Sequence, residues 1–243
     1  LRSLDRTDLA IGLVLGVAFM TYVFAMLLTS VASTLFLLTT APFMAAVIGW
    51  AWINEKPHPF TWIAMIAAII GVGLMIGDGL GFGRTTGNLV ALASALTFAI
   101  MLVMARRSGK DDVLGGTFMG GIFSCMMAGL AAVFFGAGLA ISPHDLWLTL
   151  FMGAFTIGIG IAFVTWGTSY VPAAEVSLLV LIESVLGPLW PWLFLGEAMS
   201  MLEIIGGITV LGAVALLAVV SMRTNADTQT LILESRSPEE IRK

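Results

Sequence analysis

The chain has 243 residues, of which 59% are hydrophobic and 11% are charged, and its formal net charge is −4. Soluble domains carry about 25% charged residues, so this composition excludes a water-soluble globular protein and indicates a protein embedded in a lipid bilayer. The single cysteine, Cys125, excludes an internal disulfide.

Helices that cross a membrane are predicted from apolar stretches of about 20 residues, the length that spans the hydrocarbon core. Eight stretches qualify: residues 9–28, 34–53, 60–77, 88–105, 114–135, 147–168, 176–195 and 201–220. The glycine-rich residues 77–84 are expected to form a loop, and the polar residues 222–243 a disordered tail. The predicted fold class is therefore an all-α integral membrane protein.

The distribution of Lys and Arg predicts the orientation of these spans, because cytoplasmic loops carry an excess of both residues. If the N-terminus lies inside, nearly all of the Lys and Arg residues fall on the inner side, and the outer loops hold Arg84 alone. An even number of spans puts both termini on one side. Both termini are therefore expected in the cytoplasm, and the protein in the cell inner (plasma) membrane.

Two stretches of the chain, residues 29–55 and 171–197, resemble each other without a gap at an offset of 142 residues. The identical pairs are Ala32 and Ala174, Leu37 and Leu179, Trp50 and Trp192, and Glu55 and Glu197. The offset carries the second span onto the seventh, and because this shift is an odd number of spans, the two copies cross the membrane in opposite directions. The sequence therefore predicts an inverted repeat, which is typical of secondary transporters.

The first copy of this repeat is two spans short. A complete five-span unit that ends at the third span would need two more spans before residue 9, and the chain begins with Leu1 rather than Met. We therefore expect eight helices of ten. They form a partial first unit of three helices in residues 1–79 and a second unit of five helices in residues 85–221, followed by the tail, residues 222–243. A protein with eight spans in all is the alternative.

The repeated motif also carries a resemblance. It runs from Thr39-Thr40-Ala41-Pro42 to Glu55 and Ile70-Gly71-Val72-Gly73, and again from Leu181-Ile182-Glu183-Ser184 to Gly196-Glu197, Gly206-Gly207 and Gly212. Over about residues 9–221 the chain resembles the EamA family of the drug/metabolite transporter superfamily. The resemblance implies ten helices in two inverted five-helix units around a central substrate cavity, and it does not indicate the substrate.

Glu183 is the sharpest candidate for a substrate or proton site. It lies eight residues after Glu175, near the inner end of the seventh span, which is a rise of about 12 Å in a helix. This places it close to the middle of a hydrocarbon core of about 30 Å. A carboxyl group at that depth faces a cavity or the bundle interior, where it serves as a cation, amine or proton site. The alternative is a protonated side chain that only bonds a neighbouring helix.

Prolines interrupt both copies of the repeated span, at Pro42 in the second span and at Pro188 and Pro191 in the seventh. Interrupted helices at matching places mark the binding region of many transporters, so we interpret these residues as helix breaks that act in gating. A static kink that only aids packing is the alternative.

Hydroxyl and aromatic side chains near these breaks are expected to line the cavity. The candidates are Thr39, Thr40, Ser184, Tyr22 in the first span and Trp166 in the sixth. Each of them also fits a packing or interfacial role, which is the commoner role of such residues. Glu203, near the outer end of the last span, is expected to reach the membrane interface.

Other patterns predict structure rather than function. Gly12 and Gly16, and likewise Gly116 and Gly120, are spaced by one helical turn and predict close helix packing. The two histidines, His58 and His144, fall in loops on opposite sides and cannot share a metal. No metal or other cofactor is expected.

The function indicated is a secondary transporter of small metabolites that works by alternating access. The resemblance implies an exporter. Coupling of transport to protons depends on whether Glu183 is a proton site. The expected partners are a small-molecule substrate and the lipid bilayer, with no nucleic acid; a homo-oligomer is left open. An oligomeric channel or a membrane protein without transport activity is the alternative. A membrane-embedded enzyme is least favoured, because no span holds a histidine or paired carboxylates at one depth.

Overall fold

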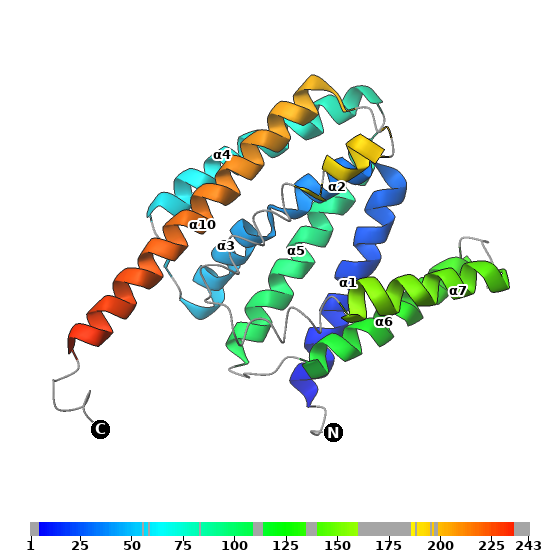
Figure 1. Ribbon diagram of the computed structural model, residues 1–243, viewed down its shortest axis with the longest axis horizontal. Coiled ribbons are helices and arrows are strands. Elements are labelled where there is room, and N and C mark those ends of the chain that lie inside the picture. Colours follow the sequence, from blue (N-terminus) through cyan, green and yellow to red (C-terminus); the bar gives the residue numbers. More distant parts are fainter. Residues whose placement is uncertain are drawn as a thin grey trace.

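The computed structural model describes residues 5–54, 56–57, 59–82, 84–108, 114–134, 140–159, 186–187, 189–194, 196 and 199–235, and the secondary structure of these residues is helical throughout. The elements are α1 (Arg6–Leu28), α2 (Val31–Leu38), α3 (Ala41–Ile53), α4 (Pro59–Phe82), α5 (Thr85–Arg107), α6 (Leu114–Phe134), α7 (Pro143–Met152), the π-helix η1 (Gly153–Ile159) and α10 (Met201–Ser235). Figure 1 shows their arrangement.

Five helical segments are long and apolar enough to cross a membrane: residues 6–28, 31–53, 85–107, 115–134 and 201–219. They correspond to the first, second, fourth, fifth and eighth predicted spans. The third appears as a shorter apolar stretch, residues 59–75 of α4. Most of the seventh span and the end of the sixth lie outside the described residues. The all-α membrane class is thus confirmed.

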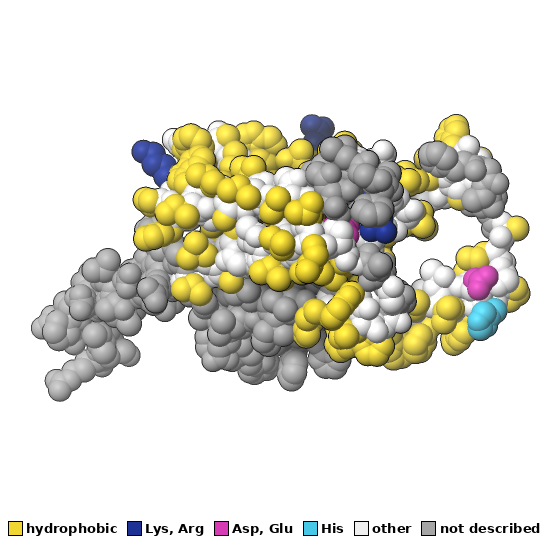
Figure 2. Space-filling model, turned by 90° about the horizontal axis from the view of Figure 1, so that it is seen from above, with side chains coloured by type: hydrophobic (Ala, Val, Ile, Leu, Met, Phe, Trp, Pro, Cys, Tyr) yellow, Lys and Arg dark blue, Asp and Glu magenta, His cyan; other side chains and the backbone are white. Residues whose placement is uncertain are grey.

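The surface of the bundle is apolar, as expected of a surface that faces lipid. Large apolar side chains are exposed on helix after helix, among them Ile69 at 70%, Trp147 at 70% and Phe134 at 84%. Hydrophobic side chains cover most of the described surface seen in Figure 2. Exposed apolar area of this extent is unfavourable in water and normal in a bilayer.

The helix α1 packs against two partners that run in different directions. It is antiparallel to α5, because the Ser94 hydroxyl donates to the Ala18 carbonyl at 2.9 Å while Thr29 at the end of α1 meets Asn88 near the start of α5. It is parallel to α6, where Gly16 approaches Phe123 so closely that a Cβ at Gly16 would lie 2.8 Å from the Phe123 Cβ. The close packing predicted from the glycine spacing is confirmed.

The helices α4 and α10 lie side by side and antiparallel (Figure 1). Gly71 and Gly206 meet backbone to backbone at their crossing: a Cβ at Gly71 would lie 2.6 Å from the Gly206 carbonyl oxygen, and one at Gly206 would lie 2.5 Å from that of Gly71. Further along, Ala64 and Ala68 of α4 pack in one buried cluster with Ala213 of α10. Small residues therefore let these two helices approach almost to backbone contact.

Two helices are longer than the sequence suggested. The glycine-rich segment expected as a loop is helical up to Phe82, since glycine in a helix costs about 1 kcal/mol but does not end it. The segment expected as a disordered tail continues α10 as far as Ser235. Between Ala213 and Ser235 the chain holds no glycine or proline that would end the helix.

Two helix ends share an unusual backbone conformation. Asn54, which ends α3, has φ 62°, and Gly196, which follows the helical residues 189–194, has φ 64°. They are the residues with positive φ in the part of the chain that the structure describes. Their separation is 142 residues, the offset of the sequence repeat. The same left-handed turn thus recurs at equivalent places, although the layout of the repeat as a whole stays a prediction.

Candidate functional site

The span over residues 31–53 is broken in its middle, where α2 ends at Leu38 and α3 begins at Ala41. The side chains of the two residues between them bond to the preceding turn. The Thr39 hydroxyl donates to the Phe36 carbonyl and the Thr40 hydroxyl donates to the Leu37 carbonyl, each at 2.6 Å. Pro42, in the first turn of α3, has no N–H to offer to the carbonyl one turn earlier. Irregular backbone at membrane depth occurs where it is buried in protein or lines a cavity.

A cavity of about 340 Å³ lies beside this break, between α3, α4 and α5. Its wall includes Thr40 at the break, Phe43 and Met44 of α3, Met65 and Ala68 of α4, and Leu92 of α5. Ile69 and Leu96 also line it and are exposed, so the cavity is open to the surface on one side. Thr40 supplies the one hydroxyl among the described lining residues, and the other side chains are apolar. The cavity therefore suits an apolar molecule or the apolar part of an amphipathic one.

The structure brings Thr40, alone among the predicted site residues it describes, to the wall of this cavity. Thr39 lies next to it at the break, and Tyr22 is half-buried on α1, away from the cavity lining. Pro191 is buried within the helical residues 189–194. Glu183, Ser184, Trp166 and Pro188 lie outside the described residues, so their proposed roles stay predictions.

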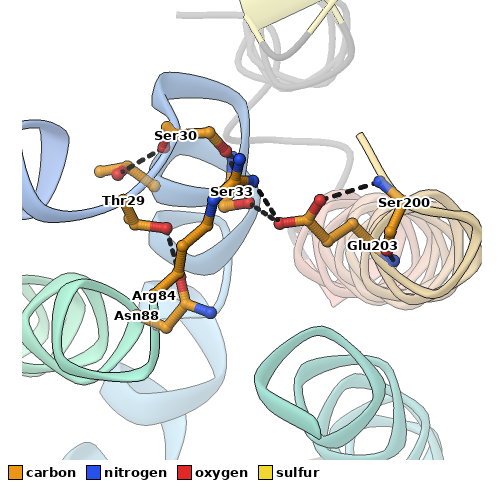
Figure 3. Close-up of polar contacts among 8 residues, drawn as sticks. Thr29, Ser30, Ser33, Arg84, Asn88, Ser200 and Glu203 are labelled. Carbon is orange, nitrogen blue, oxygen red and sulfur yellow. Dashed lines mark hydrogen bonds and ion pairs between the residues drawn. The ribbon is translucent and has the colours of Figure 1, made fainter. Parts of the chain in front are cut away.

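A second site, which is polar, lies at one end of the bundle (Figure 3). We call this end the polar end: α1 ends there, and α2, α5 and α10 begin there. Its centre is Glu203, 3% exposed. Ser33 of α2 donates its hydroxyl to Glu203 Oε1 at 2.8 Å, and Arg84, just before α5, holds a guanidinium nitrogen 3.5 Å from the same oxygen. One carboxylate thus joins three helices that are far apart in sequence.

The start of α10 explains why Glu203 is held in place. Ser200 and Glu203 cap this helix reciprocally, since the Ser200 N–H donates to Glu203 Oε2 at 2.9 Å and the Glu203 N–H donates to the Ser200 hydroxyl at 3.1 Å. Three helices, α2, α5 and α10, begin at this end, and the positive ends of their dipoles also favour a negative charge here. The expectation that Glu203 reaches the membrane interface is wrong. The sequence signal for the reciprocal cap was the spacing Ser200-x-x-Glu203, which is a capping-box pattern.

Asn88 adds a polar group to the polar end that is only partly used. It is fully buried, and its Oδ1 accepts from the Thr29 hydroxyl at 2.8 Å. Its amide nitrogen has no hydrogen-bond acceptor in the structure described. A buried donor without an acceptor costs about 1–3 kcal/mol, so the Asn88 amide nitrogen does not contribute to the stability of the packing of α1 against α5. Within the described ranges, no three His, Cys, Asp or Glu side chains come together that could hold a metal.

Comparisons with known proteins identify the family of the chain. The model of the EamA-like transporter family matches residues 8–77 and 85–219. The chain is 25% identical to the "Uncharacterized transporter YdfC" of Bacillus subtilis over 73% of this chain and 59% of that protein. It is 24% identical to "Uncharacterized transporter YwfM" of the same organism over 69% of this chain and 57% of that protein.

A relative from Archaeoglobus fulgidus, also named "Uncharacterized transporter", is 23% identical over 86% of this chain and 75% of that protein. The chain thus spans less than two thirds of the length of the two Bacillus subtilis relatives. No solved structure matches it. Since the family model covers nearly the whole of the apolar sequence, the chain belongs to the EamA-like transporter family and is a multi-pass membrane protein.

Proposed function

We propose that the protein is a secondary transporter that exports small metabolites across the cytoplasmic membrane by alternating access. The observation that carries this proposal is the break between α2 and α3 beside a cavity at the middle of a span. Secondary transporters bind their substrates near the bilayer midplane, where discontinuous helices expose polar groups that a continuous helix would use internally.

The orientation predicted for the spans relates the cavity and the polar end to the two sides of the membrane. With both termini in the cytoplasm, α1 runs outward and the polar end faces the outside. The cavity beside Thr40 then lies between the cytoplasm and the polar end. In an exporter the substrate enters this cavity from the inner side and leaves past the polar end.

The cavity also bears on the class of substrate. Its volume of about 340 Å³ is that of a site for a small organic molecule. The described wall offers apolar contacts and Thr40 as its hydroxyl, so we propose a substrate with an apolar body. Glu183 remains our candidate for binding an amine group or a coupling proton at a similar depth.

The test is solute counterflow with the purified protein in liposomes. The liposomes are loaded with one unlabelled compound from a panel of amino acids, nucleosides and amines, and uptake of the same labelled compound is followed. Saturable uptake with a transient overshoot is the expected result for a carrier. Uptake that rises linearly with concentration and shows no overshoot would indicate a channel and contradict the proposal.

A further inference from the structure

We propose that Glu203 is a latch that holds the outer side of the transport pathway closed, and that its contact with Ser33 must break each time the substrate leaves. The inference rests on the proposed function for its role in transport. Its structural part, that the contact controls access from the outside, can be tested without a substrate.

The contact lies between the two predicted units. Ser33 belongs to the first unit and Glu203 to the second, 170 residues later, and the hydroxyl-to-carboxylate distance is 2.8 Å. Arg84 stands at the end of the segment that connects the units and approaches the same carboxylate oxygen. Units that rock against each other have to separate at one end. At the polar end these contacts would part together with the Thr29–Asn88 hydrogen bond, which also joins the units (Figure 3).

The strength of the contacts suits a reversible closure. Ser33 is 1% exposed, so its bond to Glu203 is shielded from water while the end is closed. The Arg84 contact is long, at 3.5 Å, and its side chain is 34% exposed, so water weakens the ion pair. When the units part, Arg84 is already close to water, and a hydrated carboxylate replaces a buried one without the loss of a strong ion pair.

The interface of α4 with α10, one of several between the units, has a different character. Gly71 of α4 and Gly206 of α10 meet through small, apolar surfaces. A rotation there leaves few polar groups unpaired, so this crossing can serve as the pivot. The polar end, in contrast, has hydrogen bonds and an ion pair between the units that must be replaced by contacts with water when it opens.

A thiol placed at the cavity reports whether the outer side is open. Thr40→Cys is introduced into a Cys125→Ser background, which removes the exposed native thiol of α6. Right-side-out membrane vesicles are treated with a membrane-impermeant maleimide, and the rate of labelling is followed. The latch is then weakened in two independent ways, by Ser33→Ala, which removes the donor, and by Glu203→Gln, which removes the charge.

Ser94→Ala is the matched control. Ser94 is also a buried serine whose hydroxyl joins the two units, by its bond to the Ala18 carbonyl, but it lies away from the polar end. We expect Ser33→Ala and Glu203→Gln to raise the outside labelling rate several-fold, and Ser94→Ala to leave it unchanged. If Glu203→Gln fails to fold, Ser33→Ala still decides.

Labelling rates that are equal in Ser33→Ala, Ser94→Ala and the parent protein, including no labelling in any of them, would overturn the latch. The result is separate from that of the counterflow assay. If labelling responds to Ser33→Ala while no compound shows counterflow, the latch stands and the proposed transport of small metabolites does not.

Discussion

Asn54 and Gly196 hold the same left-handed backbone at φ 62° and φ 64°, and they stand 142 residues apart, each directly before the glutamate of its repeat. Glycine adopts this conformation without strain, and asparagine tolerates it better than most residues. Both residue types suit a left-handed backbone, and they stand at equivalent positions. The repeat therefore preserves a turn as well as a sequence pattern.

Substitutions at these two positions test whether the turn requires a left-handed backbone. Gly196→Ala should lower the free energy of unfolding by about 1 kcal/mol, because a Cβ is disfavoured at positive φ. Asn54→Gly should leave it unchanged or raise it slightly, and Asn54→Ala should lower it by a similar amount to Gly196→Ala. Thermal unfolding in detergent measures all three. A Gly196→Ala protein as stable as the parent would show that the turn is not constrained.

The glycine crossing of α4 and α10 should not tolerate one added carbon. Gly206→Ala puts a Cβ 2.5 Å from the Gly71 carbonyl oxygen, which forces the helices apart. We expect a loss of about 1–3 kcal/mol, as for other overpacked sites, and a lower unfolding temperature. Gly212→Ala on the same helix is the control, since an added Cβ there meets nothing within 4 Å. Equal effects of the two substitutions would contradict the packing described.

The break in the second span should matter for transport more than for stability. Pro42→Ala restores the N–H that a continuous helix needs, so we expect α2 and α3 to straighten toward one helix, with unchanged or higher stability and a transport rate at least tenfold lower. Initial rates of counterflow and unfolding temperatures measure the two effects. Pro59→Ala is the control, because Pro59 stands at the first position of α4, where proline is tolerated. Full activity in Pro42→Ala would mean that the break only aids packing.

A larger side chain in the cavity should compete with the substrate. Ala68→Leu adds volume to a wall residue of the 340 Å³ cavity that also packs in one cluster with Ala213 of α10, so we expect a lower unfolding temperature together with a several-fold increase in KM, most marked for the bulkiest substrates. Ala93→Leu, on the exposed side of α5, is the control and should transport normally. The unfolding temperature of each variant separates a filled cavity from a damaged fold. A normal KM in a stable Ala68→Leu protein would place the substrate elsewhere.

Hydropathy predicted the helices well because each span has to satisfy its own backbone hydrogen bonds within lipid. The close packing of α1 on α6 was visible in the glycine spacing for a similar reason, since only small residues permit it. Pro42 likewise pointed to the place where the span is interrupted, because a missing N–H is a local property.

The polar end was not predictable from the same patterns. A charged residue near a helix end is ordinarily placed at the membrane interface, whereas Glu203 is buried among partners that include Ser33, 170 residues away in the sequence. The cavity is also a product of three helices from separate parts of the chain, so its volume follows from their packing alone. The capping pattern from Ser200 to Glu203 was the local part of the site and the part that sequence could supply.

The repeat offset gives the polar end a further consequence. It carries Glu203 onto Thr61, which is buried near the start of α4, and Ser33 onto Glu175, which lies outside the described residues. The two hydroxyls, Ser33 and Thr61, thus both belong to the first predicted unit, and the two carboxylates, Glu203 and Glu175, both belong to the second. The predicted inverted repeat would therefore place a second hydroxyl and carboxylate, Thr61 and Glu175, at the opposite side of the membrane from Ser33 and Glu203.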